Sequence, residues 1–146
     1  MSLDNLVGIS LEKVEPDGAV IKRLLSAAER NIADSYLMEL SSENKFDAAY
    51  KAIMQLSNAA LQANGYRTLT SKPGHHATMI QILSQTIGVD KRTVIILDAL
   101  RKQRNVADYS GDIVPASAVD ECIKYAENLL HVVTDWLKEN KAELLN

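Results

Sequence analysis

The sequence has few of the residues that covalent cross-links, metal centres and membrane spans require. Its 146 residues include one cysteine, Cys122, which excludes an internal disulfide and a cysteine-based zinc site. No apolar run approaches the roughly 20 residues that a helix needs to cross a bilayer, and no segment resembles a signal peptide. We therefore expect a cytoplasmic protein that makes no use of a membrane. We also expect no metal ion and no cofactor.

The sequence also has no excess of positive charge, because 16 Lys and Arg residues against 19 Asp and Glu residues give a formal net charge of −3. Any contact with nucleic acid must therefore come from a local patch and not from the overall field of the protein. The composition, 47% hydrophobic and 24% charged, is that of a globular chain long enough to bury a core. We predict a single helical domain over residues 17–146, preceded by a weakly ordered lead-in at residues 1–16.

What the sequence does contain is a helical pattern. Apolar residues recur at spacings of three and four, and no stretch alternates convincingly at period two. Asp90 is a good N-cap, Gly65 is a natural C-cap, and Ser117 with Asp120 resembles a capping box. The predicted helices span about 17–40, 43–63, 75–87, 90–108 and 116–140. They indicate an all-α fold, an antiparallel bundle of four long helices plus one shorter helix.

The fourth predicted helix carries a dense group of polar side chains. On a helical wheel, one stripe about 100° wide holds Val94, Leu97, Arg101, Arg104, Asn105 and Asp108. A separate stripe, formed by Ile96, Leu100 and Ala107, can face the core of the protein. We therefore expect the first stripe to contact another molecule, and we predict a homodimer that uses the face around residues 97–108.

Several of these segments resemble the HEPN domains, which are small helical bundles typical of prokaryotes. Residues 42–52 are similar to the polar, aromatic, Ala-Tyr-x-Ala run of that fold. Residues 64–67 and 74–76 look like the link of the family into its next helix, and residues 100–109 resemble the motif on its later helix. The resemblance covers roughly residues 20–137 and implies a HEPN-like helical bundle.

The resemblance also implies a function. Many HEPN proteins are metal-independent ribonucleases, often toxins paired with a nucleotidyltransferase-like antitoxin. Their motif is an Arg, a polar residue and, a few positions later, a His, and two copies meet across a dimer interface. Arg104 and Asn105 match the first half, whereas Asp108 and Tyr109 occupy the region where the histidine would fall. The candidate catalytic residues are therefore Arg104, Asp108 and Tyr109, with Arg101 and Asn105 as binding residues.

The resemblance, together with this cluster, implies three functions. The leading one is a nucleic-acid- or nucleotide-associated module of a toxin–antitoxin or defence type, with weak or no catalysis because the motif histidine is missing. The second is a non-catalytic interaction protein that docks a nucleotidyltransferase-like partner. The third is a metal-independent ribonuclease, in which Arg104 stabilises charge on the phosphate. A purely structural interpretation is also open, since Arg104 and Asp108 are spaced for an intrahelical ion pair.

A second candidate binding group precedes the third predicted helix. His75 and His76 follow Gly74 near a helix N-terminus, and Arg67 lies in the preceding loop. Backbone N–H groups and basic side chains there could hold a phosphate. The alternative is a solvated turn whose histidines cap and pack. A metal site is not expected, because adjacent histidines on a helix point apart and no third ligand is evident.

Overall fold

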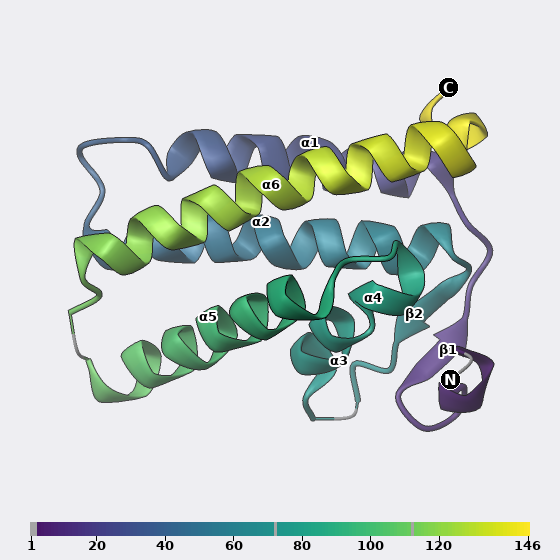
Figure 1. Ribbon diagram of the computed structural model, residues 1–146, viewed down its shortest axis with the longest axis horizontal. Coiled ribbons are helices and arrows are strands. Elements are labelled where there is room, and N and C mark those ends of the chain that lie inside the picture. Colours follow the sequence, from purple (N-terminus) through teal and green to yellow (C-terminus); the bar gives the residue numbers. More distant parts are fainter. Residues whose placement is uncertain (1–2, 72, 112) are drawn as a thin grey trace.

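The computed structural model describes residues 3–71, 73–111 and 113–146, and it is organised around one long helix, α2 (Ser42–Ala63) (Figure 1). Helix α2 packs against α1 (Gly18–Asp34) and α6 (Ala116–Asn140), and it also contacts α3 (His75–Gln81) and α5 (Lys91–Ser110). The helices pack antiparallel, as the sequence predicts. The side chains of Asp108 and Tyr109 lie outside the described part of the structure.

Small side chains make the central position of α2 feasible. Ala49, Ala52, Ala59 and Ala60 are completely buried along its length. Because an alanine adds little bulk to a helix, neighbouring helices can approach α2 closely from more than one side and pack at the density of a protein interior. Larger buried side chains, Phe46 and Ile53 among them, fill the remaining space.

The ends of the long helices follow the cap signals in most places. Asp17 caps α1 by accepting from the backbone N–H of Ala19 at 2.9 Å, and Asp90 caps α5 by accepting from Thr93 at 3.1 Å. Helix α6 has the predicted bounds, but Pro115 is its N-cap residue and no side chain caps it. The predicted capping box of Ser117 and Asp120 is therefore wrong.

Two predicted helices are shorter or divided in the structure. Helix α1 ends at Asp34 and not near residue 40. Beyond that point the backbone N–H groups of Tyr36 and Leu37 bond three residues back, to the carbonyls of Ala33 and Asp34, and the helical pattern of bonds four residues back stops. The helix predicted at 75–87 is divided at Ile82 into α3 and α4 (Leu83–Thr86). Ile82 has φ −91° and ψ 3°, and the surrounding residues are rich in β-branched side chains of lower helix propensity.

A small antiparallel sheet departs from the all-helical prediction. Strand β1 (Leu11–Lys13) pairs with β2 (Tyr66–Thr68), with Glu12 directly opposite Arg67, and a short 3-10 helix, η1 (Leu3–Leu6), precedes β1. Three-residue strands are too short to produce a visible period-two pattern, which is why the sequence does not reveal them. A second 3-10 helix, η2 (Ala142–Leu145), packs against α1 and α6.

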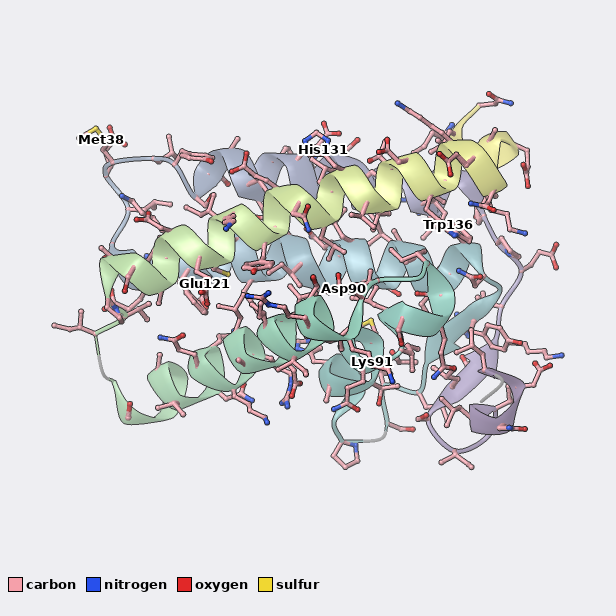
Figure 2. All side chains as sticks on the ribbon, in the orientation of Figure 1. Met38, Asp90, Lys91, Glu121, His131 and Trp136 are labelled. Atoms are coloured by element: carbon pink, nitrogen blue, oxygen red, sulfur yellow. The ribbon has the colours of Figure 1, made fainter. Side chains whose placement is uncertain are left out.

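The labelled side chains in Figure 2 show how the surface and the core divide. Met38 lies on the connection between α1 and α2 and is 89% exposed. His131 lies on the outer surface of α6, and Trp136 is half-buried against the core. Cys122 is fully buried, and burial raises the pKa of its thiol to about 12, so the thiol stays protonated at neutral pH.

Candidate functional site

A pocket of about 330 Å³ lies where α2, α3 and α5 meet, and Arg104 lines it. Helix α2 supplies most of the lining, one turn after another, while α3 supplies two residues and α5 supplies Arg104. We call this hollow the Arg104 pocket. Its lining residues are Asp47, Tyr50, Lys51, Met54, Gln55, Asn58, His76, Met79 and Arg104.

Arg104 reaches the pocket from the C-terminal half of α5. Its Nε lies 3.4 Å from Oδ1 of Asp47, and its guanidinium carbon lies 5.2 Å from the centroid of the Tyr50 ring. The arginine side chain is 33% exposed, so its charge is accessible from the pocket while its position is fixed by α2. An ion pair and a cation–π contact thus hold one guanidinium at the opening of the pocket.

Tyr50 also connects Arg104 to α3. The hydroxyl of Tyr50 lies 3.2 Å from Nδ1 of His76, within hydrogen-bond distance. The ring of His76 in turn contacts His75 edge to face, with centroids 4.7 Å apart. Arg104, Tyr50 and His76 therefore form a chain of contacts across three helices.

The surroundings of Tyr50 and His76 favour the neutral form of both side chains. Burial raises the pKa of Tyr50 to about 12, although the charges of Arg104 and Arg101 act in the opposite direction. Burial lowers the pKa of His76 below its ordinary value, and the positive charges of His75, Arg104 and Arg101 lower it further. At neutral pH, His76 is thus an uncharged imidazole that can accept a proton at one ring nitrogen.

The other residues predicted on α5 do not form the free stripe that the sequence suggests. Leu97 is completely buried and Leu100 is 1% exposed, so the two stripes of the helical wheel both face the protein. Arg101 is half-buried and bonds to Asp98 at 2.8 Å within the helix. Asn105 is half-buried beside Arg104. Among the described side chains of α5, the large apolar residues that are exposed are instead Ile95 and Val106.

The remaining predicted residues separate into two places. Arg67 lies on β2 and forms an ion pair with Glu12 of β1, so it does not line the Arg104 pocket with His76. His75 is half-buried and contacts His76 at the start of α3. Asp108 and Tyr109 belong to the last turn of α5, and the predicted roles of their side chains fall outside the described residues.

Sequence reasoning missed the contribution of α2 to the pocket. Asp47, Lys51, Gln55 and Asn58 recur every three or four residues and place a polar edge beside the buried face of that helix. This spacing was visible in the sequence as the polar side of an amphipathic helix. Nothing local indicates that the polar edge faces α5, because the contact between Arg104 and Asp47 joins residues 57 positions apart.

Comparisons with known proteins do not assign this chain to a family. The sequence matches no known family model, and it matches none of the curated proteins. Over residues 3–71, 73–111 and 113–146, no three His, Cys, Asp or Glu side chains gather in a way that could hold a metal ion. Within the same ranges, no helix combines the length and the apolar character needed to span a membrane.

Proposed function

We propose that this protein is a HEPN-like module that binds RNA or a nucleotide, and that the Arg104 pocket is its binding site. The observation that carries the proposal is the position of Arg104, which is held between Asp47 and Tyr50 at a pocket that also contains His76. Arginine is well suited to phosphate because its planar guanidinium donates several hydrogen bonds at once. A phosphate group at this position competes with Asp47 for the guanidinium.

The rest of the lining suits the other parts of a nucleotide. Met54 and Met79 are both 7% exposed and offer an adaptable apolar surface to the face of a base. The side-chain oxygen of Gln55 accepts from Asn31 at 2.9 Å, and that of Asn58 accepts from Gln62 at 3.1 Å. Their NH₂ groups are therefore oriented as donors, which a base carbonyl or a sugar oxygen can accept.

The proposal is tested by measuring binding of a fluorescently labelled uridine dinucleotide by fluorescence anisotropy. We expect Arg104→Ala to weaken binding about tenfold or more, which is the loss of one charge-assisted contact. Arg92→Ala is the matched control, because Arg92 is an exposed arginine on the same helix and does not line the pocket. Equal affinities of the two variants would contradict the proposal.

A second candidate, a metal-independent ribonuclease, is favoured by the contact between Tyr50 and His76. If Nδ1–H of His76 donates to the Tyr50 oxygen, Nε2 carries the lone pair of a general base. In that step Nε2 takes the proton of a ribose 2′-hydroxyl and the 2′-oxygen bonds to phosphorus. The bond from phosphorus to the 5′-oxygen breaks, and water protonates the leaving oxygen. Arg104 stabilises the charge on the phosphate.

Ribonuclease activity is tested by incubating total RNA with the protein in the presence of a chelator, followed by a denaturing gel. The second candidate predicts cleavage by the wild type that both His76→Gln and Arg104→Ala abolish, with cyclic 2′,3′-phosphate ends on the products. His131→Gln is the control, since His131 lies exposed on α6 and does not line the pocket. Intact RNA in every lane would restrict the function to binding.

The wider context of the proposal comes from the resemblance alone. A toxin–antitoxin or defence role, a homodimer and a nucleotidyltransferase-like partner stay predictions. Sedimentation of the purified protein tests the dimer, and a monomer at high concentration would contradict it. The Arg104 pocket is formed by helices of a single chain, so the proposed binding does not depend on the outcome.

A further inference from the structure

Two further hollows lie beyond the Arg104 pocket, one between α1 and α2 and one on the surface of α1. The first shares Lys51 and Gln55 with the pocket and extends to Arg30 and Asn31 of α1. The second shares Ala27 and Arg30 with the first and extends along α1 to residues Val20, Lys22 and Arg23. Neighbouring hollows share lining residues, so the three follow one another from α2 to α1. We call the part outside the pocket the α1–α2 groove.

The groove is positively charged although the chain as a whole is not. Arg23, Arg30 and Lys51 are exposed along it, and Asp34 is the carboxylate among its lining residues. The formal net charge of the whole chain is −3, so this excess of cations is local. A concave strip with an excess of positive charge focuses its field and attracts a polyanion more strongly than scattered surface charges do.

The geometry of the groove suits an extended ligand. Arg23 and Arg30 are two helical turns apart on the same side of α1, which separates their backbone positions by about 10 Å. The hydrogen bond from Asn31 to Gln55, 2.9 Å long, crosses the boundary between the helices and lies on the path from α1 to the pocket. At the far end, Lys22 bonds to the backbone oxygen of Asn146 at 2.8 Å. The cations that face a ligand are therefore Arg23, Arg30 and Lys51.

We propose that the α1–α2 groove is the track of a single-stranded RNA, one nucleotide of which occupies the Arg104 pocket. This inference rests on the proposed function of the pocket. A pocket that accepts an individual nucleotide requires a base that is not stacked in a duplex, and this condition selects a single strand. The phosphates on one side of that nucleotide pass Lys51, then Arg30, then Arg23. These contacts supply affinity without reading sequence, as in other grooves that follow a nucleic-acid backbone.

The test compares two labelled probes in anisotropy titrations at several salt concentrations. One is the uridine dinucleotide, which the pocket alone can hold, and the other is a uridine strand of about ten nucleotides. The double variant Arg23→Ala/Arg30→Ala removes two groove cations, and Lys91→Ala/Arg92→Ala removes two exposed cations of α5 as the matched control.

We expect the groove variant to bind the dinucleotide as the wild type does and to bind the long strand about tenfold more weakly. The slope of log K against log salt should fall by about 1.4 for the long strand, because each phosphate contact with a single strand contributes about 0.7. The control should match the wild type with both probes.

Failure of this inference is distinguishable from failure of the proposed function. If the dinucleotide binds in an Arg104-dependent way but the groove variant retains full affinity for the long strand, the proposed role of the groove is wrong and the proposed function of the pocket is retained. If neither probe binds, both are overturned. Equal affinity for a deoxyuridine strand of the same length would overturn the assignment to RNA.

Discussion

Arg104 of α5 lies over the ring of Tyr50 of α2, with 5.2 Å between the guanidinium carbon and the ring centroid. The same tyrosine places its hydroxyl 3.2 Å from His76 of α3. One side chain therefore has two separable functions, because the ring faces a cation and the hydroxyl faces an imidazole. Substitutions that remove one without the other can separate the two contacts.

The first prediction concerns this division. Tyr50→Phe keeps the ring below Arg104 and removes the hydroxyl, so dinucleotide binding should change little and the free energy of unfolding should fall by about 1 kcal/mol. Tyr50→Leu removes the aromatic face as well, and binding should weaken because Arg104 loses its cation–π contact. Anisotropy and urea denaturation of the two variants provide the comparison. A loss of binding in Tyr50→Phe equal to that in Tyr50→Leu would contradict the assigned importance of the ring.

The sequence singles out two residues that line the Arg104 pocket but not how the pocket is assembled. Arg104 and His76 stand out locally, one in a charged helix end and the other after a glycine turn, and both line the pocket. The sequence pattern places Tyr50 at an ordinary core position of an amphipathic helix, and its side chain is 2% exposed. Its role depends on two partners from distant segments, which no local pattern encodes. The groove is hidden for the same reason, since Arg30 and Lys51 meet only when α1 packs on α2.

The fold shows a similar division between local and non-local information. Helix α6 has its predicted bounds, and α2 begins within one residue of its own predicted start. Both predictions succeed because apolar periodicity and caps are local signals. The assignment of stripes on α5 is wrong because that helix contacts α2, α3 and α4 together. A helix with several neighbours needs a broad apolar face. A helical wheel drawn from the sequence cannot show how many helices will pack against that face.

The second prediction tests this corrected position of α5. Leu97→Ala removes a side chain with no exposed surface, so the free energy of unfolding should fall by about 2–5 kcal/mol. Ile95→Ala on the same helix alters a residue that is 69% exposed, and its effect should stay within about 0.5 kcal/mol. Urea denaturation followed by circular dichroism measures both. Similar small effects at the two positions would instead support the exposed stripe that the sequence suggested.

The third prediction concerns the contact between the start of α1 and the C-terminal 3-10 helix. A Cβ atom at Gly18 would lie 2.7 Å from the backbone oxygen of Leu144, too close for any carbon. Alanine at a helical position normally stabilises by about 0.5–1 kcal/mol relative to glycine. We expect Gly18→Ala to destabilise the protein by about 1–3 kcal/mol, because the clash forces η2 away from α1.

A double-mutant cycle isolates that clash. Deletion of residues 142–146 removes Leu144, and in this shortened chain Gly18→Ala should no longer destabilise. Thermal unfolding of the four proteins gives the coupling between the two changes. If the substitution lowers stability equally with and without residues 142–146, the contact with Leu144 is not its cause.

The fourth prediction follows from the environment of His76. Its pKa in the folded protein is lowered from the ordinary value of 6.5, first by burial and then by the charges of His75, Arg104 and Arg101. Below pH 6.5 the unfolded chain therefore binds more protons at this residue than the folded chain does. The free energy of unfolding contributed by His76 is fully present above that pH. It is lost as the pH falls toward the lowered pKa of the folded state.

The measurement is a series of urea denaturation curves between about pH 7 and about pH 5, above the range in which most carboxylates titrate. The wild type should lose stability as the pH falls, and His76→Gln should lose less because it has no imidazole to protonate. His131→Gln is the matched control, since this histidine lies exposed on α6, and it should keep the wild-type dependence. An identical slope for His76→Gln and the wild type would show that burial and the neighbouring positive charges do not hold the imidazole neutral, and it would remove the general base from the ribonuclease candidate.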